Sequence, residues 1–119
     1  MSDMNSPLGS PAEFFAALDH LAQTIDARAG EDVTTSYTAQ LLYAGASKCA
    51  KKLGEEATEL ALALVSESEE AVASETADLL YHLMVALKAR GITLDAVAGA
   101  LAARQGISGL TEKALRKDA

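Results

Sequence analysis

Two pairs of acidic residues in the middle of the chain have a spacing that suits cation binding. Glu56 precedes Glu59 by three residues, and Glu75 precedes Asp78 by the same interval. On a helix, residues three apart share one face, with about 5–6 Å between their Cβ atoms. Each pair would therefore present two carboxylates side by side, and a fifth acid, Glu55, directly precedes the first pair.

The two pairs could face each other across a helical hairpin. Fifteen residues separate Glu59 from Glu75, enough for a little under two helical turns, a tight connection and about two turns back. Mg²⁺ prefers about six oxygen ligands and usually keeps places for water and substrate phosphates. Four carboxylates from two helices match that demand, and Mn²⁺ could substitute because it accepts similar ligands.

Acids at helical spacing are, however, most often solvated residues without a ligand. Asp78 weakens that interpretation because it directly precedes Leu79 and Leu80, which we expect to be buried. Acids clustered beside buried surface destabilise a fold through mutual repulsion and desolvation. A bound cation would offset that cost.

Basic residues precede the acids on the same predicted helix. Lys48, Lys51 and Lys52 lie about one to two turns before them and could bind phosphate oxygens. The alternative is that these lysines only face solvent, with Lys52 in an ordinary ion pair with Glu56 four residues later. His82 could contact substrate or orient Asp78, and it could equally be a histidine packed between helices.

A second group of polar residues opens another predicted helix. Ser36, Tyr37 and Thr38 follow a polar segment, and the amides and hydroxyls at a helix start suit an anion. The simpler interpretation is a helix cap without a ligand. Cys49 has no second Cys or His at ligand spacing, so we expect a small buried side chain there.

The composition favours one small all-α domain. Half of the 119 residues are apolar, but Ala and Leu dominate and only 4% are aromatic. We expect a flexible leader over residues 1–9 and a single domain over 10–119. The net charge of −7 argues against nucleic-acid binding, which depends on Lys and Arg. The longest apolar run, 60–65, is too short for a membrane span, so we expect a cytoplasmic protein.

Caps and apolar spacing predict where the helices lie. The first should run from a capping box at Ser10 and Glu13 to about residue 29, where Gly30 supplies a stop. Two further helices are expected over about 36–45 and 46–65. Another should run from a capping box at 66–69 to about residue 90. The last two are expected from residue 93 or 95 until Gly106 and Gly109, which break the helix, and over 110–117.

Apolar stripes predict which helical faces are buried. The expected core positions are Phe14, Leu18, Leu21 and Ile25 on the first helix, Leu53, Ala57, Leu60 and Leu64 on the helix over 46–65, and Val72, Thr76, Leu79, Leu83 and either Ala86 or Leu87 on the helix that ends near residue 90. The helix ending near residue 90 is apolar almost all round from 79 to 87, and such a helix is normally covered on more than one side. We therefore expect four to five helices in a bundle that a homodimer completes.

The acidic motif resembles that of a known superfamily. Glu55-Glu56-x-x-Glu59, fifteen residues, and Glu75-x-x-Asp78 are similar to the motif of the all-α nucleoside triphosphate pyrophosphohydrolases related to MazG. Within that superfamily, the flanking residues resemble the phosphoribosyl-ATP pyrophosphatase family of histidine biosynthesis. Those residues are Ser36-Tyr37-Thr38, Lys52-Leu53-Gly54-Glu55-Glu56, residues 77–82, Ser108-Gly109-Leu110 and Glu112-Lys113-Ala114. The resemblance covers about residues 13–117.

The resemblance implies a reaction and a role for each acid. Glu56, Glu59, Glu75 and Asp78 would hold Mg²⁺, and Glu55 would be a further ligand, an outer-shell group or a base for the attacking water. The reaction would be hydrolysis of the α–β phosphoanhydride of phosphoribosyl-ATP to phosphoribosyl-AMP and pyrophosphate, with ATP-like nucleotide binding. A separate phosphoribosyl-AMP cyclohydrolase would act on the product.

Two other functions fit the same residues. One is a housekeeping enzyme that hydrolyses non-standard nucleoside triphosphates. The other is a non-catalytic helical module for dimerisation or metal binding, in which the acids would contribute no chemistry.

Overall fold

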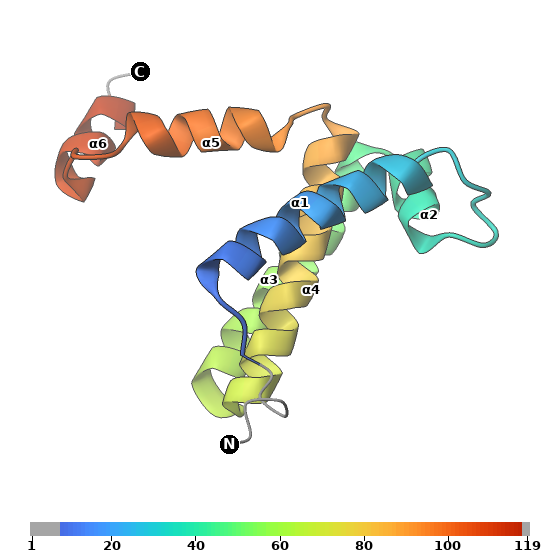
Figure 1. Ribbon diagram of the computed structural model, residues 1–119. Helices are drawn as coiled ribbons and strands as arrows, with labels where there is room; N and C mark the ends of the chain where they lie inside the picture. Colours follow the sequence, from blue (N-terminus) through green and yellow to red (C-terminus); the bar gives the residue numbers. More distant parts are fainter. Residues whose placement is uncertain (1–7, 118–119) are drawn as a thin grey trace.

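The computed structural model describes residues 8–117, and every regular element in that range is a helix. The six helices are α1 (Pro11–Arg28), α2 (Tyr37–Ala44), α3 (Ala46–Ser66), α4 (Glu69–Ala89), α5 (Leu94–Ala103) and α6 (Gly109–Lys117) (Figure 1). This confirms the all-α prediction. Most of the predicted leader, residues 1–7, lies outside the described residues, and 8–10 precede α1 without regular structure.

Side-chain caps start the helices where the sequence predicts them, with one exception. The Ser10 hydroxyl accepts from the Glu13 amide at 3.1 Å while the Glu13 carboxylate accepts from the Ser10 amide at 2.8 Å, which completes the capping box. The capping box predicted at residues 66–69 is wrong. α3 continues through Ser66, whose hydroxyl donates to the Leu62 carbonyl, and Ser68 caps α4 instead.

Glycines end two of the helices by adopting positive φ. Gly91, with φ of 72°, follows α4, and the amides of Gly91 and Ile92 donate to the carbonyls of Lys88 and Leu87. This pair of bonds is a Schellman motif, which satisfies the last carbonyls of a helix. Gly45, with φ of 97° and ψ of 175°, forms the whole connection between α2 and α3. Gly30 does not have a positive φ, and α1 already ends at Arg28.

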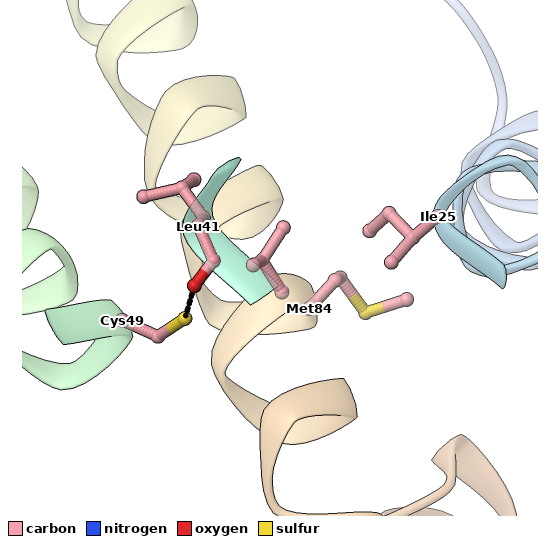
Figure 2. Packing of buried hydrophobic residues seen from close by; sticks show 5 residues of the cluster. Ile25, Leu41, Cys49 and Met84 are labelled. Atoms are coloured by element: carbon pink, nitrogen blue, oxygen red, sulfur yellow. Dashed lines mark hydrogen bonds between the residues drawn. The ribbon is translucent and has the colours of Figure 1, made fainter. Parts of the chain in front are cut away.

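The antiparallel pair α3 and α4 is the centre of the fold, and α1 and α2 pack on it (Figure 1). Ile25, Leu41, Cys49, Met84 and Val85 form the buried cluster, so all four helices contribute to it (Figure 2). From residue 79 to 87, α4 is apolar on almost all sides, and packing within one chain partly explains this feature because α4 contacts α1, α2 and α3.

Cys49 is a buried packing residue, as its isolation in the sequence predicts. The side chain is 1% exposed, and its thiol donates to the Leu41 carbonyl at 3.2 Å (Figure 2). Desolvation raises the pKa of the thiol, which keeps it protonated and unreactive.

The predicted stripe on α3 is wrong at two of its four positions. Ala57 and Leu64 are exposed, whereas Cys49 and Ala63 are buried and Lys52, Leu53, Glu56 and Leu60 are partly buried. On α4, Leu83 is 36% exposed while His82, Met84 and Val85 are buried. Both helices are apolar over more than one face, so periodicity alone could not identify the side that packs within the chain.

Helices α5 and α6 project from the bundle (Figure 1). α5 has no buried residue, although Leu94 at its start packs against the core cluster. Gly109 is the first residue of α6 rather than a break, while Gly106, with φ of 81°, lies in the turn between the two helices. No helix within residues 8–117 has the length and apolar character needed to cross a membrane.

We predict that Gly45→Ala lowers the free energy of unfolding by about 1–3 kcal/mol. The space around Gly45 is open, so the cost is backbone strain at a φ and ψ that residues with a Cβ rarely adopt. Gly30→Ala is the matched control, because Gly30 also lies in open space but does not have a positive φ. Urea unfolding monitored by circular dichroism should show no loss for the control, and equal midpoints for both variants would contradict this explanation.

Candidate active site

The acids of α3 and α4 lie close enough across the hairpin to repel one another. Burial raises the pKa of Glu75, and the charges of Glu59, Asp78, Glu56 and Glu67 raise it further. Two of these neighbours come from α3 and one from the same face of α4, as the spacing of the two pairs predicts. The hairpin therefore brings all four predicted metal ligands into one negative field.

The side chains are not arranged as a completed metal cage. Within residues 8–117, no three His, Cys, Asp or Glu side chains form a group that could hold a metal ion. The carboxylates repel one another, and a cation bound between them would offset that repulsion. The donor types and their location fit a hard divalent cation, and the ligand set stays a prediction.

Glu55 differs from the other acids because it pairs with a lysine. Lys52 Nζ is 3.1 Å from Glu55 Oε1, one turn later on α3. This hydrogen bond lowers the pKa of the Glu55 carboxyl, and the charges of Lys52, Lys51 and Lys48 lower it further. The lysines of α3 therefore stabilise the ionised form of Glu55.

Lys52 connects the acids to a neighbouring groove. Its hydrogen bond to Glu55 raises the pKa of Lys52, and Tyr37 and Glu56 raise it further. The groove has a volume of about 400 Å³ and lies between α2 and α3. Its lining residues are Tyr37, Gln40, Leu41, Ala44, Lys48 and Lys52. Three of the predicted substrate-binding residues, Tyr37, Lys48 and Lys52, thus line the same groove.

The loop before α2 determines how Tyr37 reaches this groove. Asp32 accepts hydrogen bonds from the Thr34 amide and hydroxyl, both at 2.8 Å, and these bonds lower the pKa of Asp32. Ser36 then caps α2 by accepting from the Ala39 amide at 3.1 Å. The cap makes Tyr37 the first residue of α2, with its side chain 49% exposed.

Three other predicted substrate-binding residues are buried. Ser36 is 3%, Thr38 6% and His82 8% exposed. The Ser36 hydroxyl serves the cap, and the His82 ring packs edge-on against Tyr81 and Tyr37, with centroids 5.0 Å and 6.1 Å away. Direct contact of these three side chains with substrate stays a prediction.

The sequence did not predict a site role for Tyr81 or for three residues of the groove, Gln40, Leu41 and Ala44. Gln40 lines the groove one helical turn after Tyr37, and helical spacing could have indicated it. Tyr81 contacts Thr38, Tyr37 and His82, although nothing in its local spacing distinguishes it from a core residue.

Taken together, the geometry defines a class of protein. A negative field on a helical hairpin can attract divalent cations, and an adjacent groove with two lysines and a tyrosine ring can attract a phosphorylated ring compound. These are features of an all-α enzyme that acts on nucleotides.

Comparison with known proteins identifies the family. Residues 18–105 match the model of the family described as phosphoribosyl-ATP pyrophosphohydrolase. The chain is 54% identical to the phosphoribosyl-ATP pyrophosphatase of Caulobacter sp. (strain K31), over 88% of this chain and 97% of that protein. Phosphoribosyl-ATP pyrophosphatase 1 of Rhodopseudomonas palustris is 51% identical, over 84% of this chain and 94% of the relative. The chain belongs to the phosphoribosyl-ATP pyrophosphohydrolase family, which confirms the resemblance seen in its motifs.

The crowding of acids around Glu75 predicts a pH-dependent effect on stability. A carboxyl whose pKa is higher in the folded than in the unfolded state destabilises the fold where it is ionised, and this cost disappears as pH falls through the folded pKa. In metal-free buffer, Glu75→Gln should therefore raise the melting temperature at neutral pH. The increase should shrink as pH falls through the raised pKa of Glu75.

Glu70→Gln is the control for this effect. Glu70 is on the same helix and allows the same Glu-to-Gln substitution. It lies exposed in the first turn of α4, where a negative charge interacts favourably with the helix dipole. The control should leave the melting temperature unchanged or slightly lower. An increase of the same size in both variants would show that general charge reduction, rather than crowding at Glu75, causes the effect.

Proposed function

We propose that the protein hydrolyses the α–β phosphoanhydride of phosphoribosyl-ATP, giving phosphoribosyl-AMP and pyrophosphate in histidine biosynthesis. The observation that carries this proposal is the position of the acids of α3 and α4 beside a lysine-lined groove, in a chain of this family. The relatives named above support the choice of substrate.

The groove would bind the nucleotide. Lys48 and Lys52 would bind phosphate oxygens, and the half-exposed side chain of Tyr37 would contact the base or the sugar of the substrate. Besides the hydrogen bond to Glu55, the charges of both Tyr37 and Glu56 raise the pKa of Lys52, so a phosphate bound by Lys52 would lie close to the acids of α3. The 3.1 Å ion pair supports a role for Glu55 in orienting Lys52.

The acids would hold Mg²⁺, or Mn²⁺ in its place. The proposed ligands are Glu75 and the three acids whose charges raise its pKa, Glu56, Glu59 and Asp78. The ion would neutralise charge on the leaving pyrophosphate and lower the pKa of a bound water. The repulsion among these carboxylates supports the assignment, since a cation would relieve it.

Replacing one carboxylate of the site by the corresponding amide should abolish most of the activity. We expect Glu56→Gln and Asp78→Asn each to lower kcat for phosphoribosyl-ATP by at least two orders of magnitude, because each removes a ligand that stabilises transition-state charge. Far-UV circular dichroism should show an intact fold. Glu70→Gln, outside the proposed site, should keep wild-type turnover.

The same assay separates the competing functions. Wild-type protein should release pyrophosphate from phosphoribosyl-ATP in the presence of Mg²⁺ and lose that activity with excess chelator. Turnover of a panel of non-standard nucleoside triphosphates without turnover of phosphoribosyl-ATP would indicate the housekeeping reaction. Full activity in both acid variants would reject the proposed metal site.

We also propose that the protein is a homodimer. The outer face of α3 carries Ala57, Ala61, Leu64 and Val65 at helical spacing, and all four are exposed, Val65 by 85%. A second copy covering this face would bury apolar surface that the single chain leaves in water. The proposed location is the cytoplasm, where a phosphoribosyl-AMP cyclohydrolase would consume the product.

A charge placed on the outer face of α3 should separate the two copies. Light scattering at micromolar concentration should give twice the chain mass for the wild type and the mass of one chain for Leu64→Glu, because a buried unpaired charge opposes association. Glu67→Lys, close by but outside the apolar face, should remain dimeric. A wild-type mass equal to one chain would refute the dimer.

A further inference from the structure

A hydroxyl pair connects the groove to the helix that bears Glu75 and Asp78. Thr38 Oγ1, on α2, lies 2.6 Å from Tyr81 Oη, on α4. The two residues are 43 positions apart in sequence, and Thr38 is only 6% exposed. A hydrogen bond this short, with one buried and one partly buried partner, favours one relative position of the two helices.

The same tyrosine holds the ring that lines the groove. The rings of Tyr81 and Tyr37 are nearly parallel, with centroids 6.4 Å apart and an interplanar angle of 20°. His82 packs edge-on against both rings. Stacked rings can slide over each other at small cost, whereas the hydroxyl bond allows only one register.

Tyr81 is also one helical turn from Asp78 on α4. Any displacement of Tyr81 relative to α2 therefore changes the distance between the groove and the acids. The groove lies between α2 and α3, whereas Glu75 and Asp78 are on α4, and bound substrate would have to reach both.

We propose that Thr38 and Tyr81 are positioning residues whose hydrogen bond holds Tyr37 in place for nucleotide binding. The inference rests on the proposed function for the identity of the nucleotide. This role requires no contact of either hydroxyl with substrate: Tyr81 would act through Tyr37, and Thr38 would act through Tyr81. A purely structural pair would stabilise the packing of α2 on α4 without affecting substrate affinity.

Steady-state kinetics with phosphoribosyl-ATP tests the pair. Tyr81→Phe and Thr38→Val each remove one hydroxyl while preserving the ring or the side-chain shape. Each should raise KM about fivefold, the effect of losing one typical hydrogen bond, and leave kcat within about twofold. The double variant should be no worse than either single variant, because both remove the same bond. Tyr43→Phe, which removes the hydroxyl of a tyrosine that is 85% exposed on α2, should keep wild-type KM.

Near-UV circular dichroism provides a readout that does not depend on turnover. The chain has three tyrosines and no tryptophan, and Thr38→Val retains all three. The tyrosine signal of Thr38→Val should fall while the far-UV helical signal is unchanged, because the rings lose their fixed arrangement. An unchanged tyrosine signal, additive effects in the double variant, or lower melting temperatures with wild-type KM would each overturn the proposal.

The two proposals fail in different ways. If wild-type protein does not hydrolyse phosphoribosyl-ATP, the proposed function is wrong, and the near-UV signal of Thr38→Val still decides whether the hydroxyl pair positions Tyr37. If wild-type protein is active and Thr38→Val is indistinguishable from it in both KM and near-UV signal, only the positioning role is wrong.

Discussion

The packing of α3 against α4 is the contact on which the rest of the structure depends. It brings acids from two helices into one field, where Glu75 is ionised less readily because of burial and of its acidic neighbours. Ile25 of α1 and Leu41 of α2 complete a core whose other members, Cys49, Met84 and Val85, come from this pair of helices. The fold therefore offsets the repulsion between like charges with apolar burial near the open end of the hairpin.

Lys52 lies where two regions of opposite character meet. On one side it pairs with Glu55 and is close to Glu56, and on the other side it lines the groove with Tyr37 and Lys48. A molecule that carries both a ring and a chain of phosphates has the matching distribution of chemistry. The neighbouring acidic and basic regions, rather than any single residue, distinguish this part of α3 from an ordinary charged helix.

Local signals in the sequence predicted local structure well. Ser10 with Glu13, Ser36 and Thr93 cap their helices, and Gly45 and Gly91 end theirs, because these effects act within one or two turns. The buried side of α3 was predicted less well. Its apolar residues cover a wide arc, and the side that faces α4 depends on how residues far apart in sequence pack, as the exposed Leu64 and buried Ala63 show.

By itself, the sequence determined the helical class, the caps, the spacing of the two acid pairs and the motifs of the family, since all of these depend on residue types at short separations. Only the tertiary structure decided that Glu55 pairs with Lys52 and that Tyr37, Lys48 and Lys52 share one groove. It also decided that Thr38 meets Tyr81. These contacts join side chains on different helices or select one of several possible rotamers, and the free energy that selects them comes from packing the whole bundle.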